Sequence, residues 1–149
     1  MSEKGLGIIE CLVAAVIVGI GFVAVYSLST ASTNILLSSI EREKGNMISN
    51  MIFEDILTDI ASIRTCPTTC NYHNMNFTTP ASGTTNTHDV KRTKWNTSSN
   101  TVFGSATTND VRLIEVEQIG STTKFTITVS ITSRDGRATN EFKRIINAP

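Results

Sequence analysis

One carboxylate interrupts an otherwise uncharged apolar run near the start of this 149-residue sequence. Residues 6–28 hold 18 apolar side chains in 23 positions, and their only charged residue is Glu10. A helix of that length reaches across a hydrocarbon layer of about 30 Å. Because an unpaired carboxylate in a bilayer is costly and marks a functional site by default, the pattern predicts a membrane-spanning helix in which Glu10 has a role. The alternative is that Glu10, near the start of the helix, reaches back to the membrane surface.

Thiol and imidazole groups that could bind a metal are few. Cys66 and Cys70 are followed by His73 and His88 in a Thr- and Asn-rich stretch. Three residues between the cysteines are not the spacing of a zinc knuckle, so we expect no metal site and no cofactor. The sequence also has no glycine-rich phosphate loop and no nucleophile with a paired histidine. We therefore expect a protein that is not an enzyme.

Lys91, Arg92, Lys94 and Trp95 form the one basic and aromatic cluster. Exposed on a surface, such side chains could bind a DNA backbone or an acidic polysaccharide. A solvated loop, or an edge strand whose lysines discourage aggregation, is the simpler interpretation. We favour the simpler one, because 13 basic residues balance 13 acidic ones over the chain and the local excess is small. A weak DNA or surface contact is kept as a second hypothesis.

The elements that position these residues begin with a helix that continues past the apolar run. Within residues 29–63, isoleucines recur at spacings of four and three, which places them on one helical face: Ile48, Ile52, Ile56, Ile60 and Ile63. No proline interrupts residues 1–66. The sequence therefore predicts an apolar half, residues 6–28, and an amphipathic half, residues 29–63. A domain of this size cannot bury the whole rod, so we expect a membrane or a partner to cover half of it.

The rest of the chain divides into a polar stretch and a series of strands. Thr, Ser and Asn supply 24 of the 47 positions in residues 64–110, which predicts a variable loop region. In residues 111–149 apolar and polar side chains alternate, and Gly120-Ser121 and Asp135-Gly136 are turn signals. This pattern predicts a three-stranded antiparallel meander packed on the isoleucine face of the helix. The expected fold class is α+β.

The first ten residues resemble the processing site of type IV pilins and of type II secretion pseudopilins. Lys4 and Gly5 precede the apolar run, and Glu10 is the fifth residue after the glycine. In that family a prepilin peptidase cuts after the glycine and the new first residue is N-methylated. The resemblance therefore implies a leader of residues 1–5, cleavage between Gly5 and Leu6, and methylation of Leu6. Leu6 and Gly7 stand where the family usually has phenylalanine and threonine.

The resemblance also implies an assembly role for Glu10. Cleavage creates an α-amino group, which is largely cationic at neutral pH because its reference pKa is about 8. Pairing this cation with Glu10 of a neighbouring subunit would neutralise the buried charge and fix the axial stagger between subunits. Such head-to-tail contacts do not close, so they build a helical filament. The implied partners are other pilin subunits, the prepilin peptidase, and the inner membrane before assembly.

Within that family, the chain is most similar to the minor pilins called type IV pilus modification proteins, or PilV-like proteins. Residues 10–22 and residues 51–56 carry this similarity, and Ser27 stands where major pilins usually have a proline. The implied function is to help initiate or modify a type IV pilus that supports adhesion, twitching or DNA uptake. Three alternatives stay open: a minor pseudopilin, a secreted protein cut near Ala31, and a plain single-span anchor.

The resemblance implies a type IV pilin-like fold and a location for each part of the chain. The N-terminus would be cytoplasmic, the span would lie in the inner membrane, and the headgroup would be periplasmic before it reaches the pilus on the cell surface. Because that compartment is oxidising, a local disulfide between Cys66 and Cys70 is expected. Closing so short a loop would stabilise the headgroup by about 2 kcal/mol.

Overall fold

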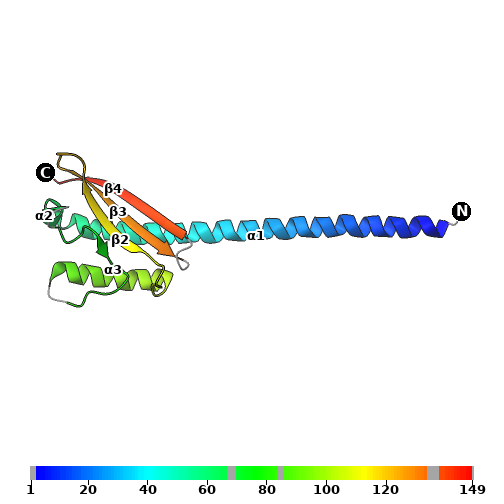
Figure 1. The fold of residues 1–149 in the computed structure, drawn as a ribbon, viewed down its shortest axis with the longest axis horizontal. Helices are drawn as coiled ribbons and strands as arrows, with labels where there is room; N and C mark the ends of the chain where they lie inside the picture. The colour runs from blue at the N-terminus through cyan, green and yellow to red at the C-terminus, as the bar shows by residue number, and fades with distance from the viewer. Residues whose placement is uncertain (1–2, 67–69, 84–85, 134–137, 149) are drawn as a thin grey trace. The chain divides into compact units, whose positions relative to one another are not determined.

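The computed structural model of the protein describes residues 3–66, 70–83, 86–133 and 138–148 (Figure 1). The chain divides into two compact units, one that ends at Ile40 and one that begins at Glu41. In chain order, the described elements are α1 (Glu3–Leu57), α2 (Ile60–Ile63), β1 (Met75–Asn76), α3 (Thr87–Phe103), β2 (Arg112–Gln118), β3 (Lys124–Ser133) and β4 (Ala138–Asn147). This order of a long N-terminal helix followed by an antiparallel sheet confirms the predicted α+β class.

The helix α1 is continuous through its Ser- and Thr-rich stretch. Thr30 and Thr33 donate their hydroxyl hydrogens to carbonyl oxygens one turn earlier, at 3.0 and 2.9 Å, so the helix itself satisfies these polar groups. Every residue from 7 to 40 is exposed. By length and composition, the helix from Gly7 onward is apolar enough to span a membrane. The predicted apolar helix is therefore present, with its side chains uncovered.

The sequence predicts one helix up to Ile63, but the structure has a break before that residue. The helix α1 stops at Leu57, and α2 is a separate turn that follows Asp59. Asp59 has φ −129° and ψ 54°, outside the helical range, and its carboxylate accepts a hydrogen bond from the Ser62 hydroxyl at 3.0 Å. The break places the Asp59 carboxylate in a polar network instead of on a helix surface.

The strands form one antiparallel sheet in the order β1-β2-β3-β4. The hairpin of β2 and β3 pairs Gln118 with Phe125 and turns at Gly120, whose φ of 59° suits glycine. The strands β3 and β4 pair from Lys124↔Asn147 to Ser133↔Ala138. The predicted meander is confirmed, and the two-residue strand β1 extends it at the β2 edge. The predicted turn at Asp135-Gly136 lies outside the described residues.

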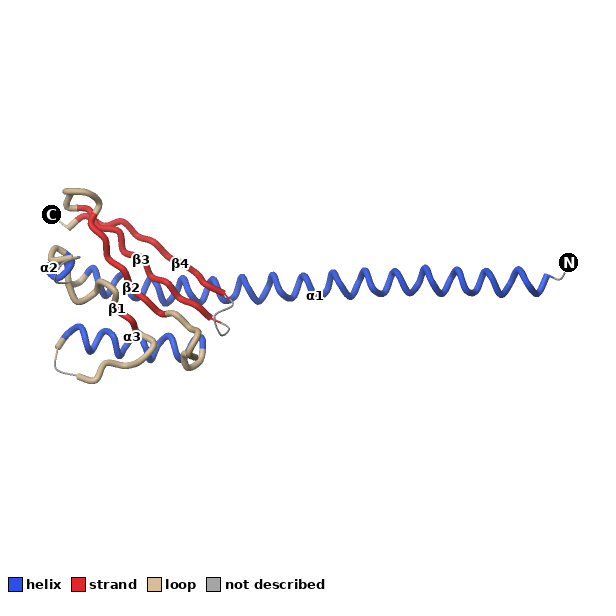
Figure 2. Tube along the Cα trace, viewed as in Figure 1, coloured by secondary structure: helices blue, strands red, loops and turns tan. Residues whose placement is uncertain are grey.

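A single hydrophobic core joins the sheet to the last part of α1. The isoleucines Ile48, Ile52, Ile56 and Ile63 are at most 2% exposed, and Ile60 is partly buried. The same core holds the alternate residues of β2 and β3 that face inward: Ile114, Val116, Phe125, Ile127, Val129 and Ile131. Figure 2 shows the strands crossing the C-terminal part of α1. The predicted packing of the isoleucine face on the sheet is confirmed.

The prediction of a loop throughout residues 64–110 is wrong for residues 87–103, which form α3. Thr, Ser and Asn are poor helix formers, and they dominate this segment. The residues that α3 buries are Trp95, Asn96 and Ser99, so its inner face is largely polar. A search for apolar residues at helical spacing therefore finds no helix here.

The ends of α3 nevertheless carry local signals in the sequence. The side chain of Asn86 accepts a hydrogen bond from the backbone N–H of Asp89 at 2.9 Å, which is the arrangement of a helix N-cap. Gly104 follows the last residue with φ 86°, a conformation that favours glycine. An asparagine before the helix and a glycine after it are the signals that could have predicted α3.

The core packing predicts that two isoleucine-to-alanine variants lower the free energy of unfolding by very different amounts. Ile56→Ala removes a fully buried side chain and should lower the free energy of unfolding by about 2–5 kcal/mol. Ile145→Ala, on β4 at 66% exposure, should cost less than about 1 kcal/mol. Urea unfolding of the full chain in detergent, followed by the fluorescence of the single tryptophan, measures both. Equal losses in the two variants would contradict this packing.

Candidate functional site

The residues of the expected processing and assembly site all lie on α1. Gly5 and Leu6 belong to its first turns, and Glu10 is exposed on the helix. Within the described part of the chain, Glu10 has no hydrogen bond or ion pair, and the side chains around it are apolar and exposed. Cleavage between Gly5 and Leu6, methylation of Leu6 and pairing of Glu10 stay predictions.

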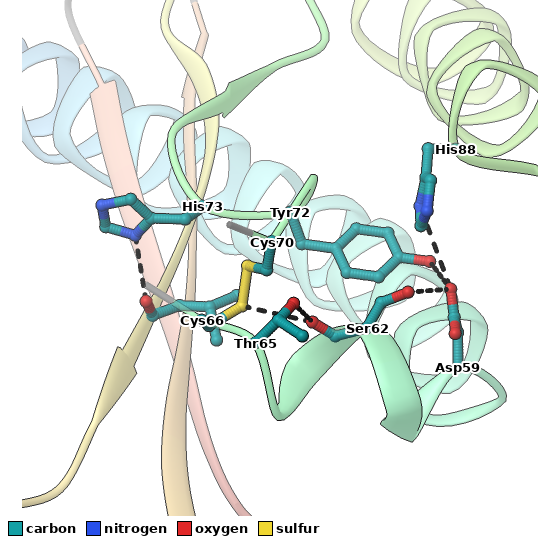
Figure 3. The surroundings of a disulfide bond; sticks show 9 residues. Asp59, Ser62, Thr65, Cys66, Cys70, Tyr72, His73 and His88 are labelled. Carbon is teal, nitrogen blue, oxygen red and sulfur yellow. Dashed lines mark hydrogen bonds and ion pairs between the residues drawn. A yellow bond between two sulfur atoms is a disulfide. The ribbon is translucent and has the colours of Figure 1, made fainter. Parts of the chain in front are cut away.

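The disulfide between Cys66 and Cys70 is present (Figure 3). The two Cα atoms are 4.6 Å apart, and Cys66 is buried at 4% exposure. The backbone N–H of Cys66 donates to the carbonyl of Ile63 at 2.9 Å, so the bridge directly follows α2. The disulfide thus fixes the chain that leaves α2 next to the segment that carries Tyr72 and His73.

Asp55 is the centre of the contact between α1 and α3. Its carboxylate accepts hydrogen bonds from Lys94 Nζ at 2.9 and 2.8 Å, and from Trp95 Nε1 at 2.8 Å. The Trp95 ring is fully buried, whereas the Lys94 side chain is half exposed. Asp55 therefore satisfies an indole N–H that has no access to water and neutralises a lysine at the rim.

A second group of polar contacts joins Lys91 of α3 to Tyr72 and Asp59. Lys91 Nζ donates to the Asp55 carbonyl oxygen at 2.6 Å and to the Tyr72 hydroxyl at 3.0 Å. The Tyr72 hydroxyl in turn donates to Asp59 Oδ2 at 2.8 Å, and His88 Nδ1 lies 3.9 Å from the same oxygen (Figure 3). The chain of contacts Lys91–Tyr72–Asp59 links α3, the segment after the disulfide, and the break between α1 and α2.

This network shifts the pKa values of two of its members. Burial alone would raise the pKa of Asp59, but hydrogen bonds from Tyr72 and Ser62 and the charge of Lys91 outweigh burial and hold it below its usual value. Burial, followed by the hydrogen bond to Asp59, raises the pKa of Tyr72 well above its usual value. At neutral pH the pair is therefore a phenol that donates to a carboxylate.

Among the four residues of the basic and aromatic cluster at residues 91–95, only Lys94 is exposed, and Lys91 and Arg92 are partly buried. Trp95 is inside the core, and the amines of Lys91 and Lys94 bond to oxygens of Asp55. The helical spacing of α3 directs these side chains toward α1, which a loop or an edge strand would not do. Arg92 differs, because it lines an open cavity between residues 71–76 and the start of α3. The weak DNA or surface contact stays a prediction, but Trp95 is not available to it as an exposed aromatic side chain.

Arg112 is a site residue that the sequence interpretation missed. It is 1% exposed, and its guanidinium donates to Ser99 Oγ at 2.9 Å, to Asn100 Oδ1 at 2.5 Å and to the Gly104 carbonyl at 2.8 Å. Burial lowers the pKa of Arg112, and the charge of Asp110 acts in the opposite direction. The cation thus satisfies groups at the C-terminal end of α3, where a helix favours positive charge.

The position of Arg112 in β2 is the feature of the sequence that indicates its burial. Arg112, Ile114 and Val116 share one face of β2, and all three are buried. Alternation along the strand therefore places an arginine at an inward position. A buried arginine requires acceptors nearby, and the carbonyls and amides at the end of a helix supply them here. The alternation along β2 would therefore have predicted a buried arginine that requires several acceptors near the start of the strand.

The two histidines and two paired cysteines do not form a metal site. His73 Nδ1 is hydrogen-bonded to the Val116 carbonyl at 2.9 Å, and His88 Nδ1 faces Asp59. Across the described residues, no group of three or more His, Cys, Asp or Glu side chains could hold a metal ion. The expected absence of metal and cofactor stays a prediction for the chain as a whole.

Comparison with models of known protein families, with curated proteins and with solved structures found no match to this chain. The geometry thus defines an α+β protein with an uncovered apolar helix, a disulfide and a polar contact between two helices.

Alanine variants of two neighbouring acids, Asp55 and Glu54, should differ in stability, because Asp55 contacts a buried group and Glu54 lies on the surface. Asp55→Ala leaves the buried Trp95 N–H without an acceptor, so it should lower the free energy of unfolding by about 2–3 kcal/mol. Glu54→Ala breaks an exposed pair with Arg144 and should cost no more than about 1 kcal/mol. The Asp55→Ala variant should also show red-shifted tryptophan emission in its native state. A smaller effect for Asp55→Ala than for Glu54→Ala would contradict the role assigned to Asp55.

The lowered pKa of Asp59 predicts acid sensitivity. The unfolded chain takes up a proton near pH 3.9 and the folded chain only at lower pH, so this stabilisation is complete above about pH 5 and is lost as the pH falls further. Asp59→Asn should lower stability at pH 7 and flatten the loss between about pH 5 and 3. Urea unfolding at each pH, with the exposed variant Glu117→Gln as control, tests this. Parallel pH profiles for wild type and Asp59→Asn would refute it.

Proposed function

We propose that this chain is a minor type IV pilin that inserts its N-terminal helix into a pilus and displays the unit from Glu41 onward as a headgroup. The observation that carries the proposal is one continuous helix that has a processing-like Gly5-Leu6 pair, a single acid at Glu10 and an uncovered surface that is apolar over residues 7–28. That surface needs lipid before assembly and the helices of other subunits afterwards. The same protein can therefore exist in two apolar environments.

The chemistry of Glu10 supports assembly over simple anchoring. A single-span anchor gains nothing from a carboxylate in its apolar segment, because each buried charge without a partner is costly. In a bundle of such helices, an amino group at the start of a neighbouring mature chain can neutralise it. The attraction strengthens in a low-dielectric surrounding, so it selects one axial stagger between neighbours. Glu10 would thus guide a subunit into register as well as compensate charge.

The contacts of the headgroup support a display role. Its core is complete within residues 48–148, so the apolar half of the helix is not needed to bury it. The Asp55 and Arg112 contacts hold α3 in place, and the disulfide closes the chain after α2, as suits a small domain outside the cell. The polar side chains that Asp55 and Arg112 contact are engaged in holding the fold, and they give no support to an enzymatic role.

A minor pseudopilin of a type II secretion system is the alternative that shares these features. The two functions predict different effects of deleting the protein. A minor pilin predicts loss of pili and of the adhesion, twitching or DNA uptake that they support. A pseudopilin predicts loss of protein export. Deletion in the host, scored for surface pili and for secreted proteins, distinguishes them. A DNA-binding role for the headgroup is less supported, because Lys91, Lys94 and Trp95 are engaged within the fold.

The proposed role of Glu10 is tested by removing its charge. Glu10→Ala and Glu10→Gln should leave membrane insertion intact and reduce the amount of the protein in sheared pili by at least tenfold. Glu43→Ala, an exposed acid on the same helix, is the matched control and should assemble normally. Immunoblots of membrane and pilus fractions measure both steps. Normal incorporation of the Glu10 variants into pili would refute the assembly role.

A further inference from the structure

An open cavity of about 400 Å³ lies between the segment before β2 and the first turns of α3. Residues 71–76 form one wall, and residues 86–92 contribute the other. Its volume is within the range of small-molecule sites. Both walls are fixed from behind, because Tyr72 bonds to Asp59 and Asn96 Nδ2 donates to the carbonyls of Phe77 and Thr78 at 3.0 and 2.7 Å. The cavity is therefore part of the folded headgroup and not a gap between mobile loops.

Four asparagines dominate the lining: Asn71, Asn74, Asn76 and Asn86. Among the described residues, Asn71 and Asn74 have no side-chain hydrogen bond, and Asn76 and Asn86 use only their oxygen atoms. Each carboxamide offers donors and an acceptor in one plane. The cavity therefore presents a set of unused donors, with acceptors among them, to a ligand that needs both.

The remaining lining residues narrow the class of ligand. Arg92 and Asp89 share the cavity, so a small anion would meet a carboxylate and a cation would meet a guanidinium. Among the described residues that line the cavity, Met75 is the one apolar side chain, so the cavity does not suit a mainly apolar ligand. Arg92 Nη2 already donates to Thr79 Oγ1 at 3.2 Å, which orients the guanidinium and leaves Nη1 without a partner in the described structure.

We propose that this asparagine-lined cavity is a saccharide-binding site that holds one hexose ring. Hydroxyl groups are both donors and acceptors, so they match carboxamides, with Arg92 donating and Asp89 accepting at the charged positions. Met75 supplies an apolar surface for a ring C–H face. The proposal concerns the headgroup alone, and it stands or falls independently of assembly into a pilus.

The test uses the ¹⁵N-labelled full-length chain in detergent, titrated with glucose, galactose, mannose and N-acetylglucosamine. At least one sugar should saturably shift the side-chain amide signals of the four cavity asparagines with a millimolar Kd. Asn74→Gly keeps the left-handed backbone at this residue, where φ is 57°, while it removes the amide, so it should weaken binding at least tenfold without unfolding the chain. Arg92→Gln should do the same, and the exposed variant Lys143→Gln should bind like wild type.

Three results would overturn the saccharide site. The first is that none of the four sugars shifts these amides. The second is that acetate or inorganic phosphate shifts them at the same concentration, which would assign the cavity to anions. The third is that Asn74→Gly and Arg92→Gln, with native tryptophan fluorescence, bind the sugar as tightly as wild type.

Discussion

The apolar surface of the N-terminal half of α1 is the constraint on which the whole account depends. Residues 7–40 are exposed throughout, and the headgroup core is complete without them. A contiguous apolar surface of this extent is larger than soluble proteins leave in water, and such surfaces mark contacts with a membrane or with other proteins. In the proposed pilin, lipid and then neighbouring helices supply that contact, and Glu10 is the one charged residue within residues 7–40 that they have to accommodate.

In the second unit, the helix α3 has a low intrinsic helix propensity and depends on contacts with its neighbours. The helix α3 consists largely of Thr, Ser and Asn, and it contributes few apolar side chains beyond Trp95. Polar contacts replace the missing hydrophobic contact: Asp55 binds the middle of α3 and Arg112 binds its C-terminal end. Each anchor is expensive to bury alone and stabilising when fully bonded, so α3 has one well-defined position. That position forms one wall of the asparagine-lined cavity.

Periodicity in the sequence predicted the parts of the fold that apolar residues determine. The isoleucine face of α1, the β2–β3–β4 meander and their common core follow from spacings of four, three and two, and all are present. The helix α3 and the contacts of Lys91, Lys94 and Trp95 did not follow, because their buried face is polar and pairs with Asp55, a residue 40 positions from Trp95. The N-cap Asn86, Gly104 and the inward phase of Arg112 were the usable signals.

The N-terminus of the mature protein tests the central claim most directly. Intact-mass and N-terminal fragment spectra of the protein purified from its host membrane should show a chain that begins at Leu6, with one added methyl group on its amine. Such a start would place Glu10 at the fifth position of a processed, assembly-competent helix. A chain that retains residues 1–5, or one that begins near Ser32 after loss of the apolar segment, would contradict the proposed pilin function.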